Sequence, residues 1–200
     1  MANVFGRWSG EGVKVTDLGL ASYIVLDSKQ IPHSFGRQTQ KRFEKGKMSI
    51  VERLVNKAMR SGQGKRKLSG KYVRGRGSCG KKMQAMGIVE SAFEIVEKKT
   101  KENPLQVLVK AIENAAPRED ITKIKRGGIA YAVAVDVAPM TRVDEALKNI
   151  ALAGFVGSFK KKTDAAEALA EELILASKED PKSLSVKRRD EVERIAKSSR

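Results

Sequence analysis

Residues 103–137 read NPLQVLVKAIENAAPREDITKIKRGGIAYAVAVDV and combine a helical pattern with a strand pattern. Asn103 followed by Pro104 is a typical N-cap and first helical residue. Apolar side chains then recur at spacings of three or four residues, which predicts a helix that Pro117 closes. The residues of this stripe are Leu105, Leu108, Ile112 and Ala115. Beyond Pro117 the apolar period becomes two, so a β-structure is expected to follow the helix.

The β-structure is predicted to be a hairpin. Two runs, 121–126 and 129–137, flank Gly127-Gly128, a dipeptide typical of tight hairpin turns. In the second run large residues alternate with Ala and Asp, so one face of the strand is large and apolar and the other is small. The large residues are Ile129, Tyr131, Val133, Val135 and Val137. Such a strand is expected to lie on a core or on a partner.

Caps and apolar periodicity predict helices on both sides of the hairpin. Asp17 is expected to cap a short helix over 18–23, and Ser49 with Glu52 to form the capping box of a helix over 50–60. A long helix should begin near Lys81, with Met83, Met86, Val89, Phe93 and Val96 as its apolar stripe. The later helices are one that carries Val143, Leu147 and Ile150, one that Asp164 caps, and one over about 187–197.

The predicted fold class is therefore mainly α, a bundle of about six helices with one protruding β-hairpin and a basic N-terminal extension. Residues 1–47 are assigned to the extension, and 48–200 to a single helical domain with a basic loop at 61–82 and the hairpin at 120–138. Residues 32–47 are basic with little apolar periodicity. They are predicted to be an extended arm, with a solvated linker as the alternative.

The charge is concentrated in the first part of the chain. The 200 residues have a net charge of +16, and residues 61–82, SGQGKRKLSGKYVRGRGSCGKK, contain eight Lys or Arg and no acidic residue. Buried, unpaired cations are costly, so this run must face water or an anion. A nucleic-acid backbone is the favoured anion. The small number of aromatic residues weighs against a module that stacks several bases on exposed rings.

Several other classes of site are disfavoured. A single Cys, Cys79, and a single His, His33, cannot form an intrachain disulfide or a His/Cys zinc site. Residues 75–82, GRGSCGKK, are one residue from a phosphate-binding P-loop, but Lys82 stands where Ser or Thr is needed and no apolar strand precedes them. No apolar run reaches the length of a membrane span. We expect a cytoplasmic protein that is not an enzyme and has no cofactor.

Five motifs, in order along the chain, resemble the family of small ribosomal subunit protein seven. They are IVERL at 50–54, NPLQVLV at 103–109, ENAAPRED at 113–120, AVDV at 134–137 with Pro139 and Arg142, and ERIAKSSR at 193–200. Residues 5–8, FGRW, and the form of the ending resemble the archaeal and eukaryotic branch. The resemblance runs from about Phe5 to Arg200.

The resemblance implies a six-helix protein with a β-ribbon in the head of the small subunit. It implies binding to the 3′ major domain of small-subunit rRNA, early action in folding of the head, and no catalytic residues. The implied partners are that rRNA, neighbouring proteins of the head and platform, exit-site tRNA and mRNA, with no membrane. The family often has Arg-Arg where this chain has Thr141-Arg142, so one contact is expected to be missing.

The predicted rRNA-binding residues have two origins. Those implied by position in the family are Arg53, Lys57, Lys81, Lys82, Lys123, Lys125 and Arg142. Those hypothesised from charge in the arm and the loop are Lys41, Arg42, Lys65, Arg66, Lys67, Lys71, Arg74 and Arg76. Those implied to lie near tRNA or mRNA are Arg126, Gly127, Gly128 and Tyr131 at the ribbon tip.

Two other functions remain open at this point. An architectural DNA-binding protein also combines helices with a β-ribbon, but it usually carries an apolar wedge at the ribbon tip. Here only Ile129 could serve as that wedge. A protein-only assembly scaffold could use the Ala/Val strand, but it would leave the charge of the first 82 residues unexplained.

Overall fold

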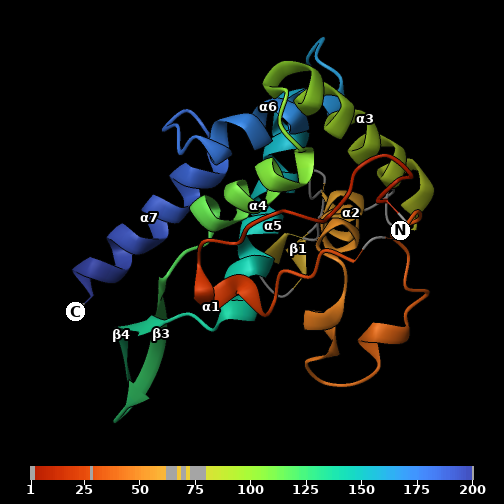
Figure 1. Ribbon diagram of the computed structural model, residues 1–200. Helices are drawn as coiled ribbons and strands as arrows, with labels where there is room; N and C mark the ends of the chain where they lie inside the picture. The colour runs from red at the N-terminus through yellow and green to blue at the C-terminus, as the bar shows by residue number, and fades with distance from the viewer. Residues whose placement is uncertain (1–2, 28, 62–66, 69–70, 73–79, 200) are drawn as a thin grey trace.

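A computed structural model describes residues 3–27, 29–61, 67–68, 71–72 and 80–199. Its helices are α1 (Leu18–Ala21), α2 (Ile50–Arg60), α3 (Lys82–Thr100), α4 (Pro104–Ala115), α5 (Pro139–Ser158), α6 (Ala165–Ser177) and α7 (Leu184–Ser198). Its 3-10 helices are η1 (Arg37–Thr39) and η2 (Glu44–Lys47). Its antiparallel pairs are β1 (Lys67–Leu68) with β2 (Lys71–Tyr72), and β3 (Glu119–Arg126) with β4 (Ile129–Asp136). The described helices and the projecting β3–β4 hairpin confirm the predicted mainly α class (Figure 1).

The core is built around α6, which packs against α3, α4 and α5. The stripe of α4 is confirmed, because Leu105, Leu108 and Ile112 are fully buried and Asn103 caps the helix through Oδ1, 3.0 Å from the amide nitrogen of Leu105. Glycine lets α5 approach α6 closely. A Cβ atom on Gly157 would lie only 2.8 Å from the Cβ of Ala168.

Residues 3–26 are part of this body rather than a detached extension. Val4, Trp8, Leu20 and Ile24 are buried in the same core as the helices. The indole of Trp8 packs edge-on against Phe93, with ring centroids 5.6 Å apart, and its Nε1 donates to Glu97 Oε2 at 3.0 Å. The sequence prediction missed this packing because these apolar residues follow no helical or strand period.

Residues 32–47 do not form an extended arm. They fold into a compact loop that contains η1 and η2, and the two short helices contact each other. The loop is attached to the bundle where Ser34 donates to Glu52 and where Gly46 is buried against Tyr23. The anchoring groups lie far apart in sequence, so local composition could not indicate this fold.

Three local predictions were also wrong. Ser49 stands at the N-cap of α2, but its side chain makes no capping hydrogen bond, and Glu52 bonds to Ser34 and Lys82 instead, so the capping box is not formed. Met83 is 73% exposed rather than part of the apolar stripe, whose buried residues on this part of α3 begin with Ala85 and Met86. Helix α7 begins at Leu184, where Ser183 caps it, rather than near Lys187.

Candidate nucleic-acid interface

The β3–β4 hairpin places Lys123 and Lys125 on one face and most of its large apolar residues on the other. The register pairs Lys125 with Ala130 and Lys123 with Ala132, and directly opposed residues of an antiparallel pair share a face. One face therefore presents two exposed lysines among alanines. Alanine has a short side chain, so a nucleic-acid backbone can approach this face until it meets the two ammonium groups.

The opposite face is largely apolar and lies open to solvent, with Asp120 and Thr122 near its base. It carries Ile124, Ile129, Tyr131, Val133 and Val135, whose exposed fractions are 39, 60, 50, 38 and 39%. The predicted strand with one large face is thus present, but that face does not cover this protein's own core. An apolar face of this kind on a soluble domain is typical of a surface that contacts another molecule.

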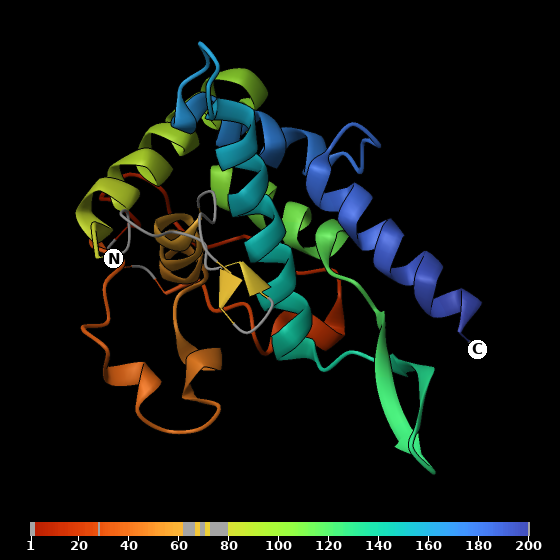
Figure 2. The same cartoon turned by 180° about the vertical axis from the view of Figure 1, so that it is seen from behind.

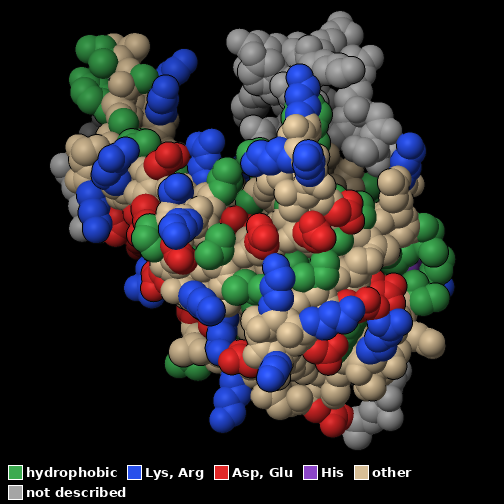
Figure 3. Space-filling model, turned by 90° about the horizontal axis from the view of Figure 1, so that it is seen from above, with side chains coloured by type: hydrophobic (Ala, Val, Ile, Leu, Met, Phe, Trp, Pro, Cys, Tyr) green, Lys and Arg blue, Asp and Glu red, His purple; other side chains and the backbone are tan. Residues whose placement is uncertain are grey.

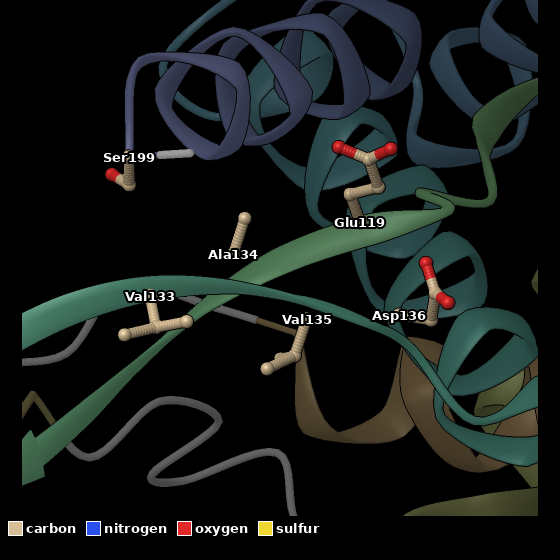
Figure 4. Close-up of a pocket in the computed structure, with 6 residues that line it drawn as sticks. All are labelled: Glu119, Val133, Ala134, Val135, Asp136 and Ser199. Atoms are coloured by element: carbon tan, nitrogen blue, oxygen red, sulfur yellow. The ribbon is translucent and has the colours of Figure 1, made fainter.

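A hollow of about 380 Å³ lies between the base of the hairpin and the end of α7. In Figure 4, Glu119 and Ala134 point toward the end of α7, whereas Val133 and Val135 point to the other side of the ribbon. Two carboxylates, Glu119 and Asp136, line the hollow. The exposed lysines lie farther along the ribbon, so the candidate interface is placed there.

The hairpin and the 32–47 loop project from the same end of the molecule, on either side of α1 and the start of α5 (Figures 1 and 2). The opposite end, around α3 and α6, is seen from above in Figure 3 and shows basic and acidic side chains interspersed. The molecule thus offers two projections at one end, and both carry exposed basic residues.

Near the 32–47 loop, three cations surround one carboxylate. Asp144 on α5 lies 2.5 Å from Lys45 Nζ, 3.4 Å from Arg53 Nη2 and 3.4 Å from Lys57 Nζ. Burial raises the pKa of Asp144, but the hydrogen bond from Lys45 and the positive charges around it outweigh burial and bring the pKa below its ordinary value. The group remains a carboxylate at neutral pH and leaves an excess of positive charge around it.

Arg53 does not face RNA. Its side chain is 1% exposed, its Nη1 donates to the carbonyl oxygen of Tyr23 at 3.0 Å, and its Nη2 pairs with Asp144. It therefore fastens the chain before α2 to α2 and α5, and it lies outside the interface. Lys57 is different, because its side chain is 26% exposed. Burial lowers the pKa of Lys57, and Asp144 offsets part of that effect.

Lys82 and Arg142 are also engaged within the protein. Lys82 Nζ lies 2.6 Å from Glu52 Oε1, and Glu52 is almost completely buried. Burial raises the pKa of Glu52, but hydrogen bonds from Lys82 and Ser34 lower it by more than burial raises it. The pKa of Glu52 is therefore below its ordinary value. Arg142 pairs with Asp17 at 2.9 Å, and its side chain is only 11% exposed. Both cations mainly join distant segments of the fold.

The remaining predicted residues fall into three groups. Those with exposed positions are Lys41, Arg42, Lys81, Lys123, Lys125, Tyr131, Gly127 and Gly128. Those outside the described residues are Lys65, Arg66, Arg74 and Arg76, while Lys67, Lys71 and Arg126 are described only by their place in a strand. Sequence reasoning missed Lys45 and Asp144. No local pattern marks them, because their contact joins segments 99 residues apart.

The side chains of this region do not resemble a metal centre. Within the described ranges, no group of three or more His, Cys, Asp or Glu side chains is placed to hold a metal ion. The helices in those ranges are also too short or too polar to cross a membrane. His33 is committed to its own loop, where its Nδ1 accepts the backbone N–H of Phe35 at 2.8 Å.

Comparison with known proteins decides the family. The model of the family described as "Ribosomal protein S7p/S5e" matches residues 20–200. The chain belongs to this family. It is 46% identical, over the full length of both chains, to a protein of Methanothermobacter thermautotrophicus named small ribosomal subunit protein uS7. It is also 46% identical to the protein of that name from Methanosphaera stadtmanae, over 98% of this chain and 97% of the relative. The resemblance found in the sequence motifs is thereby confirmed.

Proposed function

We propose that this protein is a structural, non-enzymatic component of the small ribosomal subunit in the cytoplasm and that it binds the 3′ major domain of the small-subunit rRNA. Family membership supports the ribosomal role. The observation that carries the RNA contact is the alanine-lined face of the hairpin, with Lys123 and Lys125 as its exposed cations. Phosphate contacts of this kind position a protein on RNA, and the shape of the folded RNA then supplies selectivity.

The two ends of the interface would act together. The loop at 32–47 contributes Lys41 and Arg42, and Lys81 stands at the start of α3. With the hairpin on the other side, phosphates held at these places would hold the rigid bundle in one orientation. An rRNA junction that fits both projections at once would be preferred over a uniform duplex. This arrangement would help organise folding of the subunit head.

The apolar face of the hairpin supports contacts of a second kind. Ile124, Val133 and Val135 are suited to a neighbouring protein of the head or platform, because their partly exposed side chains would lose water on contact. Toward the tip, Gly127 and Gly128 leave the turn narrow, and Tyr131 is half exposed. We assign this tip to the approach of exit-site tRNA and mRNA.

The test is chemical footprinting of the 3′ major-domain rRNA with the wild type and with K123A/K125A. We expect the double variant to stay folded and to lose protection at the nucleotides that the hairpin covers, while protection elsewhere persists. A matched control is K99A/K110A, since both lysines lie in exposed ion pairs on α3 and α4. Identical footprints for the wild type and K123A/K125A would refute the hairpin contact.

A further inference from the structure

Two phenylalanines of the basic 32–47 loop are exposed to an unusual degree. Phe35 is 76% exposed and Phe43 is 69% exposed. The small number of aromatic residues weighs against base stacking as long as the positions of the rings are not known. In the folded protein, two of the six phenylalanines lie on the surface of one compact loop.

The backbone holds both rings in conformations that L-residues seldom adopt. Phe35 has φ 51° and Phe43 has φ 68°, both in the left-handed region. A bulky side chain is uncommon there, and such strain is often found where a side chain must be held in place for binding. Phe5 shares this conformation, but it packs on Trp8 and Phe93. For the two exposed rings, the described structure offers no comparable packing in the core.

Each exposed ring is paired with a polar neighbour in a way that restricts its motion. The Phe35 ring stacks on His33, with centroids 4.2 Å apart and planes at 17°. The guanidinium of Arg42 lies over the Phe43 ring, 5.1 Å from its centroid. Because both rings nevertheless remain largely exposed, ring surface is left for another flat group.

The loop that carries the rings is fixed to the bundle at several points. Ser34 donates both its backbone N–H and its hydroxyl to the buried Glu52, each at 2.9 Å. Lys45 contacts Asp144 on α5. Within the loop, Gln38 Nε2 donates to the carbonyl oxygen of Lys47 at 3.2 Å, which holds its two halves together. The rings are thus held in place before any ligand binds, which lowers the entropic cost of binding.

The charges around the rings select the ligand. Arg37, Lys41, Arg42 and Lys47 are basic residues of this loop, and Glu44 is the one acidic residue between 29 and 47. Flat apolar rings next to several cations match an unpaired nucleotide, whose base stacks while its phosphate is neutralised. A purely apolar protein surface would leave those cations without counter-charges.

We propose that Phe35 and Phe43 form a stacking site for unpaired RNA bases, with Arg42 and its basic neighbours on the adjoining phosphates. This site rests on the proposed RNA-binding function and adds to it a preference for looped or bulged nucleotides. The ligand class is unpaired RNA, and the two rings can each take one base.

The test measures the affinity of the full-length protein for the 3′ major-domain rRNA at fixed salt, with F35A and F43A. Each variant should bind about five- to 150-fold more weakly, the range expected for losing one stacked base. F35W and F43W should restore binding, because tryptophan also stacks. I31A is the matched control, since Ile31 is 62% exposed and apolar but not aromatic, and it should bind as the wild type does. Thermal unfolding of each variant checks the fold.

Irradiation of the wild-type complex with ultraviolet light gives an independent readout, with nucleotide adducts expected on Phe35 or Phe43 by mass spectrometry. Ala variants that bind rRNA as tightly as the wild type would overturn the stacking site. If those variants bind rRNA normally but enter reconstituted subunits poorly, the rings contact a protein and the proposal also fails. If the wild type itself does not prefer this rRNA to duplex DNA, the proposed function fails first, and the two failures are distinguished.

Discussion

Replacing Asp144 by alanine should destabilise the protein strongly, because it removes the only carboxylate that the described structure places against the buried guanidinium of Arg53. That side chain is 1% exposed, and after the change it would keep the Tyr23 carbonyl as a partner but no negative charge. Removing one partner of a buried ion pair costs about 3–5 kcal/mol, out of a total stability of about 5–15 kcal/mol. The repulsion among Lys45, Lys57 and Arg53 would add to this loss.

The measurement is urea unfolding followed by circular dichroism at pH 7. With a slope of about 2 kcal/mol/M, the midpoint should fall by about 1.5–2.5 M. E145A is the neighbouring control, because Glu145 pairs with Lys148 at the surface and its loss should cost less than about 1 kcal/mol. R53M/D144A should recover much of the stability, since no guanidinium then remains fully buried without a carboxylate.

The assignment of Arg53 as a buried structural cation would be refuted if the D144A midpoint lay within about 0.5 M of the wild type. At this slope, that difference is a loss of about 1 kcal/mol. A double variant no more stable than D144A would refute the assignment as well.

Three further predictions concern pH, helix packing and salt. Asp17, Glu52 and Asp144 have lowered pKa values in the folded protein, so their contribution to stability is present above about pH 4–5 and is lost as pH falls through the folded pKa values. Urea midpoints should therefore fall steeply on acidification, and E52Q should make this fall less steep. Parallel curves of midpoint against pH for the wild type and E52Q would contradict the assigned role of Glu52. G157A should lower stability by about 1–3 kcal/mol, because its methyl group meets Ala168, whereas G87A, at an open position of α3, should raise it by about 0.5–1 kcal/mol; equal midpoints would contradict this packing. R74A/R76A/K81A, which spares the Lys82–Glu52 pair, should reduce the slope of log affinity against log salt by about 0.7–0.9 for each phosphate that the variant no longer neutralises; an unchanged slope would exclude the 61–82 loop from RNA contact.

Features that depend on nearby residues could be predicted from the sequence. The cap at Asn103 and Pro104, the stripe of α4 and the Gly127-Gly128 turn all involve groups within a few positions of one another. The folded protein confirms each of them. The placement of Lys123 and Lys125 on one face and most large apolar residues on the other also follows from alternation once the register is known, and the register follows from the turn.

Features that depend on distant contacts could not be predicted. Glu52 has the spacing of a capping-box residue, but in the fold it meets Ser34 and Lys82, which local patterns do not bring to it. Arg53 was predicted to be an RNA-facing cation of α2, but in the fold it pairs with Asp144, which lies 91 residues later in the chain. Exposure of Phe35 and Phe43 likewise depends on how the 32–47 loop is fixed to the bundle.

The most direct test of the central claim is a competition binding experiment with the purified protein, the 3′ major domain of small-subunit rRNA and an excess of mixed-sequence duplex DNA at two salt concentrations. We predict tight binding to the rRNA that survives the DNA competitor at the higher salt, because shape and unpaired bases add to the phosphate contacts. Equal binding to rRNA and DNA, lost together as salt rises, would contradict the account and would favour a non-specific or DNA-architectural protein.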